Sequence, residues 1–561
     1  MKILFALLLA LIPPAAQAAP PMLQDLSIEE LAGQLFMIAV DTSIAVDREA
    51  DIRAGRLGGG LLRWDRFTGA EAAAFTAKMR EWSADSPHKI PFWVSTDHEG
   101  GPTFTQRKYG VTPFPGNMAL GAAGSEALVK DMARSTALEL RALGIHVTFA
   151  PVIDVNSNPL NPIVGLRSFG EDPALVARLG NAALAGYREG GLLAVVKHFP
   201  GHGDTSEDSH LGLPVSTKTL AELDAVELVP FRAAFAAGAA AVMPAHMVFP
   251  ALGTDPVTPV TLSSAATSGF LRGRMAFNGL IFSDSLDMGA IANVHGSSQA
   301  AIGALEAGVD VLLLGKADFP SAFAALVDAV KNGRVSRARL ERSVARVLKA
   351  KRRFELFERK APRPLSAELL EKHRRLARRA AEAAVTLVRN DGTIPLRLKD
   401  GDRLGLVMIH APRYAEESAL FAAEITKRHP LVDIVDVPAM YPSTTTIEAA
   451  LAKVAGASAV ILGTYQYGTP TAPNAALLIR RLVDSSSPIV AVSMMNPYDL
   501  SLSTGANAAV CAYGMTASSL EAAARLIFGE IPAHGRLPVT LPGVAARGAG
   551  LIKKPSGGRT Q

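Results

Sequence analysis

The segment 197–210 carries a dense group of side chains that could do chemistry. Its sequence is Lys-His-Phe-Pro-Gly-His-Gly-Asp-Thr-Ser-Glu-Asp-Ser-His, and it follows the apolar stretch 191–196. Histidines and carboxylates on a loop at a strand end suit proton transfer and ligand binding. Zinc binding is an alternative, because His198, His202, Asp208 and His210 are all possible ligands. Neither an HExxH nor a cysteine-based spacing supports zinc, so we expect no metal here.

The elements that must position this loop are short apolar runs alternating with Ala-rich amphipathic segments. Strands are predicted at 36–40, 59–64, 92–97, 147–154, 193–199, 240–246, 280–284 and 309–314. This alternation is typical of a (β/α)8 barrel and equally of a doubly wound open sheet. Polar residues end five of the runs, namely Asp97, Asp154, Lys197-His198, His246 and Asp284. Since barrel enzymes build their sites from the carboxyl ends of several strands, we predict a TIM-like barrel.

A second α/β pattern follows the barrel. Its predicted strands are 385–389, 404–410, 432–437, 459–465, 489–495 and 508–513, separated by helical segments, which predicts a smaller three-layer αβα sandwich domain. We place the catalytic barrel at 19–354, a linker with a connecting helix at 355–384 and the sandwich at 385–543. Residues 544–561 are glycine-rich and basic, and predict a flexible tail.

Residues 1–18 resemble a secretory signal peptide. Lys2 precedes the apolar stretch 3–12, which is too short to span a bilayer, and Ala16-Gln17-Ala18 is a small-residue cleavage site. No cysteine stands directly after the apolar stretch to carry a lipid, and no later segment predicts a membrane span. We therefore expect an exported, periplasmic protein.

Length and charge exclude some classes of function. With 561 residues the chain is long enough for two or three domains, each with a substantial core. The formal net charge of +5 is small for this length, and no basic-aromatic stripe predicts a nucleic-acid partner. The single cysteine, Cys511, excludes an intrachain disulfide, and its apolar surroundings predict a buried thiol. The oligomeric state stays open.

The segment 197–210 closely resembles the KHFPGHG-x4-D-[ST]-H signature of the NagZ-type β-N-acetylglucosaminidase branch of glycoside hydrolase family 3. In that branch the Asp-x-His pair supplies the general acid/base, which maps onto Asp208 and His210. The resemblance extends over nearly the whole mature chain. It implies the barrel, and it agrees with the second domain, which members of the family often carry.

The resemblance also implies a nucleophile. Residues 279–288 resemble the family's nucleophile strand, in which apolar residues precede S-D-x-L-x-M, and the first aspartate carries over as Asp284. Asp287 is the competing carboxylate, which we interpret as the cap of a following helix. Retaining glycoside hydrolysis needs a carboxylate that attacks the anomeric carbon and an acid that protonates the leaving oxygen. In this assignment Asp208 orients His210 and raises its proton affinity.

Substrate contacts follow from the same resemblance. Lys197 and His198 match a pair that hydrogen-bonds sugar hydroxyls, Asp97 matches the aspartate of a D-x-E-G-G motif, and Arg167 matches an R-S-F-G arginine. A structural ion pair of Arg167 with Asp154 or Glu171 is the alternative. Arg107 corresponds to a sugar-binding arginine, but about two extra residues precede it and make its assignment insecure. His246 and Asp154 are expected just behind the site.

The resemblance therefore implies a retaining exo-β-N-acetylglucosaminidase that needs no metal and no organic cofactor. The expected substrates are cell-wall fragments, GlcNAc linked to MurNAc or anhydro-MurNAc, and then chito-oligosaccharides. Because a histidine acid repels phosphate less than a carboxylate would, a β-N-acetylglucosaminide phosphorylase is one alternative. A β-glucosidase or xylosidase of the same family is another, and a non-catalytic periplasmic glycan-binding protein is a distant third.

Overall fold

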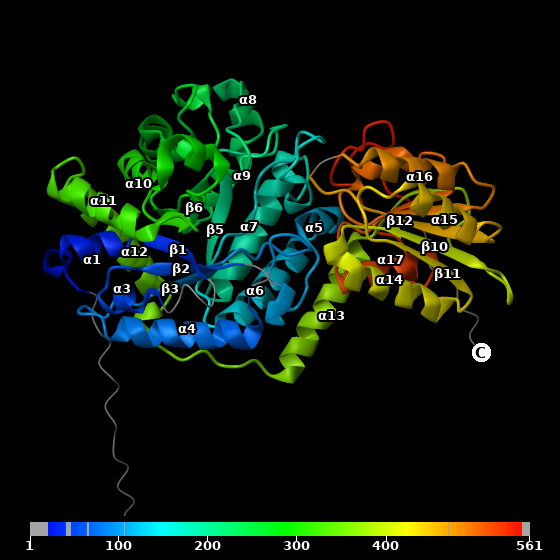
Figure 1. Ribbon diagram of the computed structural model, residues 1–561, viewed down its shortest axis with the longest axis horizontal. Helices are drawn as coiled ribbons and strands as arrows, with labels where there is room; N and C mark the ends of the chain where they lie inside the picture. The colour runs from blue at the N-terminus through cyan, green and yellow to red at the C-terminus, as the bar shows by residue number, and fades with distance from the viewer. Residues whose placement is uncertain (1–20, 41–46, 64–66, 106, 469, 553–561) are drawn as a thin grey trace, which may run out of the picture.

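The computed structural model describes residues 21–40, 47–63, 67–105, 107–468 and 470–552, and shows two domains side by side (Figure 1). The predicted signal peptide, 1–18, lies outside these residues. The first domain contains eight strands: β1 (Phe36–Val40), β2 (Gly59–Leu62), β3 (Trp93–Thr96), β4 (Val147–Thr148), β5 (Leu193–Phe199), β6 (Ala241–Pro244), β7 (Leu280–Ile281) and β8 (Leu312–Gly315). Each lies within or overlaps its predicted run.

These strands form a closed parallel barrel. They are hydrogen-bonded in the order β7-β6-β5-β4-β3-β2-β1-β8, and a parallel bridge between Phe282 and Val311 joins the two ends. The aromatic rings of Trp93 and Phe149 lie 6.4 and 5.7 Å from the ring of Phe282, so side chains fill the lumen. The predicted (β/α)8 barrel is confirmed, and the open sheet is excluded.

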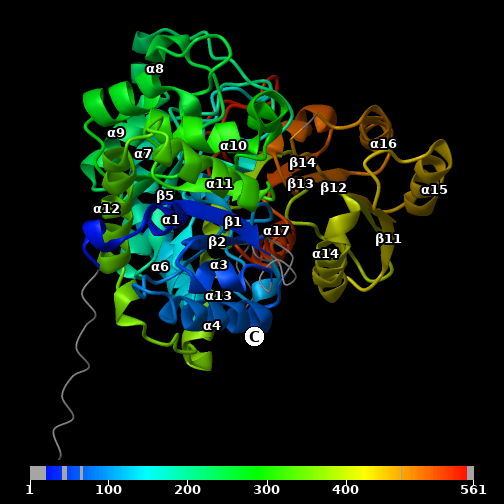
Figure 2. The same ribbon diagram turned by 60° about the vertical axis from the view of Figure 1, so that its left-hand side comes forward.

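Helices surround the barrel (Figures 1 and 2). They are α1 (Ile28–Gly33), α3 (Glu49–Arg53), α4 (Gly69–Ala84), α5 (Asn117–Ala123), α6 (Glu126–Ala142), α7 (Pro173–Glu189), α8 (Leu220–Ala225), α9 (Leu228–Ala236), a π-helix (Ala265–Arg274), α10 (Gly289–Ala307), α11 (Phe319–Lys331) and α12 (Arg337–Arg353). Ser27, Thr68 and Thr219 open α1, α4 and α8 with capping boxes, which satisfy backbone N–H groups at the helix start.

The second domain is a three-layer sandwich. Helix α13 (Ala367–Ala384) leads into a sheet of order β11-β10-β12-β13-β14-β9, in which only β9 is antiparallel to its neighbour. Its strands are β9 (Thr386–Asn390), β10 (Leu404–Ile409), β11 (Val432–Val437), β12 (Ala459–Thr464), β13 (Ile489–Ser493) and β14 (Ala508–Cys511). Helices α15 (Thr444–Val454) and α16 (Pro473–Val483) cover one face, and α14 (Ala415–Arg428) and α17 (Ala517–Ile527) cover the other (Figure 1). Cys511 is fully buried, as expected.

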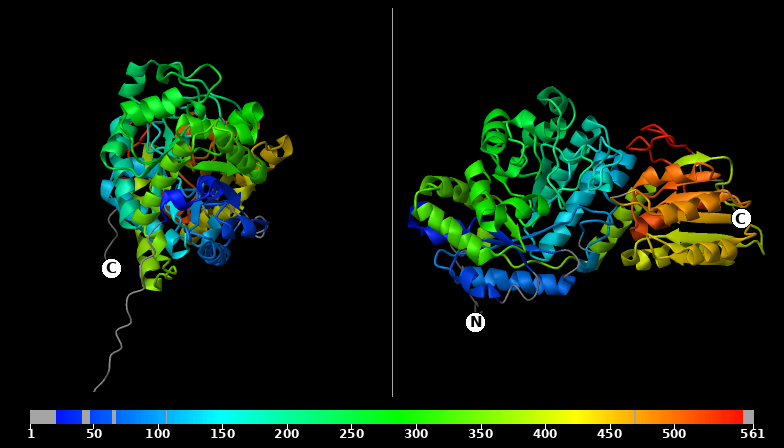
Figure 3. Two further views of the ribbon diagram at one scale, coloured as in Figure 1. Left: turned by 90° about the vertical axis from the view of Figure 1, so that its left-hand side faces the viewer. Right: turned by 45° about the horizontal axis from the view of Figure 1, so that its top comes forward.

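The two domains pack closely (Figure 3). Met118 and Ala119 of α5 belong to the hydrophobic core of the second domain. The Asn156 side-chain amide donates to the Tyr498 hydroxyl at 2.7 Å, across the domain boundary. A Cβ atom on Gly165, whose φ is +41°, would lie 2.7 Å from Asn496 Oδ1. Only glycine allows this approach, so the second domain is fixed beside the barrel loops.

Residues 544–552, the first part of the predicted flexible tail, contact both domains, and residues 553–561 of that tail lie outside the described residues. The Leu551 N–H donates to the Leu387 carbonyl at 2.8 Å, and Arg547 forms an ion pair with Asp172 at 2.8 Å. These contacts hold residues 544–552 against β9 and the barrel, because a backbone donor and a charged group find partners there. No helix among the described residues has both the length and the apolarity to cross a membrane.

Candidate active site

A cavity of about 400 Å³ lies at the carboxyl ends of the barrel strands. Seven of the predicted site residues line it: Asp97, Arg167, Lys197, His198, Asp208, His210 and Asp284. They come from the ends of β3, β5 and β7 and from the loops after β4 and β5, as is usual for barrel enzymes. Residues more than 180 positions apart in the sequence thus share one cavity.

His210 is held by Asp208 on the loop after β5. His210 Nδ1 lies 2.7 Å from Asp208 Oδ1, and the His210 backbone N–H donates to the same oxygen at 2.9 Å. This hydrogen bond raises the pKa of His210, which partial burial opposes and the negative charge of Asp284 supports. Because Nδ1 is engaged by the carboxylate, Nε2 is the nitrogen available for proton exchange. The imidazole also stacks on Phe104, with ring centroids 6.3 Å apart.

Asp284 follows β7 and is ionised. Burial alone would raise its pKa, but the nearby side chains of His246, His198 and Lys197 lower it to about 2. Its Oδ1 accepts the Ser285 N–H at 2.7 Å. A half-buried carboxylate that remains charged at neutral pH is suited to attack an electrophilic carbon.

His246 lies behind Asp284. Its ring is fully buried, and Nε2 donates to the Ser285 carbonyl at 3.0 Å, while Nδ1 lies 2.9 Å from Thr261 Oγ1. Burial lowers the pKa of His246. The ring therefore fixes the backbone that carries Asp284, and it does not line the cavity.

Lys197 and His198 are neighbours in sequence, yet both line the cavity. Neighbouring strand residues normally face opposite sides, but here the β5–β6 register shifts between Lys197 and Phe199 and the Lys197–His198 peptide bond is cis. The alternation is therefore interrupted, and both side chains line the cavity. Asp154 holds this part of the chain, because its carboxylate accepts the His198 N–H at 3.0 Å and lies 2.7 Å from His198 Nδ1. It also accepts the His202 N–H at 2.8 Å. Asp154 thus shapes the loop without lining the cavity.

Glu99 is the residue that sequence reasoning missed. It is almost fully buried, and its carboxylate forms two hydrogen bonds with the Arg167 guanidinium, at 2.8 and 2.9 Å, and an ion pair with Lys197 at 2.7 Å. Burial opposes its ionisation, but Arg167 and Lys197 lower the pKa of Glu99 to about 2. The spacing Asp97-x-Glu99 was the available signal, since residues two apart at a strand end tend to share a face.

This cluster places charged donors and acceptors at the cavity wall. Lys197 Nζ lies 3.1 Å from Asp97 Oδ1, and Arg167 packs over the Phe104 ring at 4.4 Å. Arg167 forms its ion pair with Glu99 and not with Asp154 or Glu171, the two partners that the sequence suggested. Burial raises the pKa of Asp97, while Lys197 pulls it down. Fixed carboxylate, ammonium and guanidinium groups of this kind recognise the hydroxyls of a polar ligand.

Asp287 does not cap α10, as we had interpreted it. The N-terminal residue of that helix has no side-chain cap, and Asp287 instead accepts the Lys316 N–H at 2.8 Å and the Ser285 hydroxyl at 2.6 Å. The carboxylate thereby joins the loops after β7 and β8.

Arg107 begins a short 3-10 helix (Arg107–Tyr109), and its side chain lies outside the described part of the structure. Arg63 lines the cavity as a further basic residue.

The candidate zinc ligands have other partners. His198 pairs with Asp154, and His202 Nε2 lies 3.0 Å from Ser209 Oγ. Within the described residues, no three His, Cys, Asp or Glu side chains converge as a metal site would require.

The second domain contributes one side chain to this cavity. Tyr467, in the loop after β12, lines it together with Arg167 and Phe104. The Tyr467 hydroxyl is buried and has no hydrogen-bond partner among the described residues. Burial raises the pKa of Tyr467 to about 12, so the hydroxyl keeps its proton and can donate it in a hydrogen bond. Because buried donors normally have a hydrogen-bond partner, this hydroxyl is suited to donate to an oxygen of a bound ligand.

An ionised aspartate and a carboxylate-held histidine in one barrel cavity could serve as the nucleophile and the acid/base of glycoside hydrolysis. The model for the glycosyl hydrolase family 3 N-terminal domain matches residues 27–350, and the chain belongs to this family. The beta-hexosaminidase A of Pseudoalteromonas piscicida is 34% identical over 351 residues, which are 58% of each protein. The chain therefore matches just over half of that protein's length.

Solved structures extend the similarity to both domains. The family 3 β-N-acetylglucosaminidase of Paenibacillus sp. str. FPU-7 has a TM-score of 0.85 and 34% sequence identity, over 92% of this chain and 99% of that chain. The β-glucoside phosphorylase BglX has a TM-score of 0.79 and 26% identity, over 92% and 95% of the two chains. The two-domain architecture is thus shared over nearly its full length.

Proposed function

We propose that the protein is a retaining exo-β-N-acetylglucosaminidase that removes GlcNAc from the non-reducing end of a glycan. The single observation that carries this proposal is the Asp208–His210 pair on the wall of the cavity that also contains Asp284. Retaining hydrolysis needs one nucleophilic carboxylate and one group that serves first as acid and then as base. The names of the similar hexosaminidase and β-N-acetylglucosaminidase support GlcNAc as the sugar.

In the first step, an Asp284 carboxylate oxygen attacks the anomeric carbon and the glycosidic bond breaks. The leaving oxygen takes the proton from His210 Nε2, while Asp208 stabilises the imidazole through Nδ1. In the second step, a water molecule loses a proton to Nε2 and attacks the same carbon, which releases Asp284 and the sugar. Each step inverts the configuration of the anomeric carbon, so the product retains the configuration of the substrate.

Asp97, Lys197, His198 and Arg167 would bind the sugar hydroxyls. Lys197 and Arg167 are positioned by Glu99, and His198 by Asp154, so the donors are held before substrate arrives. Preorganised groups of this kind lose little entropy on binding. We infer that Tyr467 adds a hydrogen bond from the second domain, which makes that domain part of the site.

Cell-wall fragments, GlcNAc-MurNAc or its anhydro form, are the substrates we propose first, with chito-oligosaccharides next. The predicted signal peptide at 1–18 supports export to the periplasm. A phosphorylase is the second candidate, because the acid is an imidazole and the fold is shared with a β-glucoside phosphorylase. Phosphorolysis would release a sugar 1-phosphate, at a rate that rises with phosphate concentration.

The test compares release of 4-nitrophenol from its β-GlcNAc and β-glucoside conjugates, with and without phosphate. We expect strong preference for the GlcNAc conjugate and free GlcNAc as product. Equal or faster turnover of the glucoside would refute the sugar assignment. GlcNAc 1-phosphate as the main product would favour the phosphorylase.

A further inference from the structure

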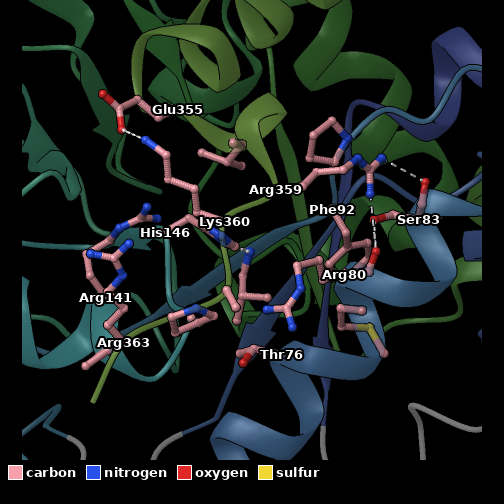
Figure 4. A pocket seen from close by; sticks show the side chains of 18 of the residues that line it. Thr76, Arg80, Ser83, Phe92, Arg141, His146, Glu355, Arg359, Lys360 and Arg363 are labelled. Atoms are coloured by element: carbon pink, nitrogen blue, oxygen red, sulfur yellow. Dashed lines mark hydrogen bonds and ion pairs between the residues drawn. The ribbon is translucent and has the colours of Figure 1, made fainter. Parts of the chain in front are cut away.

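A second cavity lies at the opposite end of the barrel from the candidate active site. It has a volume of about 380 Å³ and lies at the amino ends of β3 and β4. Its walls are α4, the last turn of α6, the residues before β4 and the linker 355–365 (Figure 4). We call it the basal pocket. It shares no lining residue with the candidate active site.

The basal pocket is strongly positive. Five cations line it, Arg80, Arg141, Arg359, Lys360 and Arg363, against one carboxylate, Glu355. The Glu355 carboxylate forms an ion pair with Lys360, whose Nζ lies 3.6 Å from Glu355 Oε2. Lys360 also pairs with Glu358, outside the pocket lining. The negative charge of Glu355 also acts on Arg141, but one carboxylate against five cations leaves the lining with an excess of positive charge.

The arginines fall into two groups. The Arg359 guanidinium donates to the backbone carbonyls of Arg80 and Ser83, each at 3.3 Å, and to that of Lys89, so it fastens the linker to α4. The guanidinium groups of Arg80, Arg141 and Arg363 form no hydrogen bond or ion pair with any described residue. Arg80 and Arg141 are nevertheless half-buried. Half-buried guanidinium groups without acceptors are free to bind an anion.

His146 adds a neutral donor to the same pocket. The Val94 N–H donates to His146 Nδ1 at 3.1 Å, so the neutral ring carries its hydrogen on Nε2. Burial lowers the pKa of His146 well below its usual value, and the positive charges of Arg141, Lys351 and Arg80 act in the same direction. Burial also lowers the pKa of Arg141. A cavity that concentrates positive charge in this way favours a negatively charged occupant.

We propose that the basal pocket binds a phosphate-bearing small molecule, with Arg80 and Arg141 on the phosphate oxygens and His146 donating a further hydrogen bond. Guanidinium groups match phosphate geometry and form strong, charge-assisted hydrogen bonds with it. The cavity lies within the range of small-molecule sites and has room beyond the phosphate itself. Because Arg363 and the linker form one wall, an occupant ties the linker to the barrel.

Titration calorimetry and thermal unfolding of the full chain test this site, with inorganic phosphate and pyrophosphate as probes and sodium chloride at matched ionic strength. For the wild type we expect one molecule of the probe to bind in the basal pocket of each chain, and we expect the Tm to rise with probe concentration. Loss of one charge-assisted hydrogen-bonding arginine weakens binding about tenfold or more. The R80Q/R141Q double variant should therefore not bind the probe in the basal pocket, and its Tm should not rise with probe concentration.

R480Q is the matched control, because Arg480 is an exposed arginine of the second domain outside the pocket. It should bind as the wild type does. If the double variant does not fold, R363Q, which alters an exposed linker residue, should still weaken binding. Turnover of the GlcNAc conjugate should be unchanged in these variants. No binding above the chloride control in the wild type, or unchanged binding in R80Q/R141Q, would overturn the proposal.

Discussion

His210 Nδ1 and Asp208 Oδ1 are 2.7 Å apart, and the same carboxylate oxygen also accepts the His210 backbone N–H. One aspartate therefore fixes the ring, its tautomer and its proton affinity. Because the hydrogen bond with Asp208 raises the pKa of His210, a larger fraction of the imidazole is protonated near neutral pH. This relationship has a direct consequence for the pH profile.

Replacing Asp208 by Asn should move the alkaline limb of kcat/KM to lower pH. The first step needs a protonated His210, so lowering the pKa of His210 removes the active form at a lower pH. Profiles of wild type and D208N on the 4-nitrophenyl GlcNAc conjugate measure this. D204N, a change of a partly exposed aspartate on the same loop, is the control and should keep the wild-type limb. A D208N limb at the wild-type position would contradict the role of Asp208.

Asp284→Asn should lower kcat by at least about 10⁴-fold, since no covalent glycosyl-enzyme can form. Asp287→Asn is the matched control, because its carboxylate also lines the cavity but holds Lys316 and Ser285. We expect a far smaller loss for it. Steady-state kinetics and mass spectrometry of a trapped glycosyl-enzyme distinguish the two, and a trapped sugar on Asp287 would overturn the assignment of Asp284.

Glu99→Gln should destabilise the fold by about 3–5 kcal/mol, because it leaves the buried cations Arg167 and Lys197 short of a counter-charge. It should also raise KM, since these cations lose their positions. Glu126→Gln removes the exposed partner of Arg178 and should cost less than about 1 kcal/mol. Denaturant unfolding of both variants measures the difference. Similar values for the two would show that the Glu99 pairs contribute little.

Tyr467→Phe should raise KM about 2- to 12-fold with little change in stability. The hydroxyl has no hydrogen-bond partner among the described residues, so the fold loses none, while a bound ligand loses one worth about 0.5–1.5 kcal/mol. Kinetics and Tm of Y467F measure both effects. A lowered Tm with an unchanged KM would assign Tyr467 to the domain interface instead.

Much of the fold could be predicted from the sequence, because apolar runs ended by polar residues are local signals. The limits of β1, β5 and β11 match the predicted runs, whereas β4 and β7 are only two residues long because the chain turns into site loops after Thr148 and Ile281. Lys197 and His198 both line the cavity because the alternation is interrupted there, which strand periodicity does not reveal.

The remaining features of the site depend on long-range packing. Glu99 pairs with residues 68 and 98 positions away, and Tyr467 reaches the barrel from the other domain. No local pattern fixes such distances. The assigned roles of Asp284, His210 and Asp208 came from the family resemblance, and they stay predictions until the variants are measured.

The most direct test of the account is azide rescue of His210→Gly on the 4-nitrophenyl GlcNAc conjugate. Loss of a general acid/base should lower the rate about 10²- to 10⁴-fold. Azide needs no general base, so it should restore part of the rate and give the β-glycosyl azide as product. Unchanged activity in His210→Gly, or a loss that azide does not relieve in a folded variant, would contradict the account.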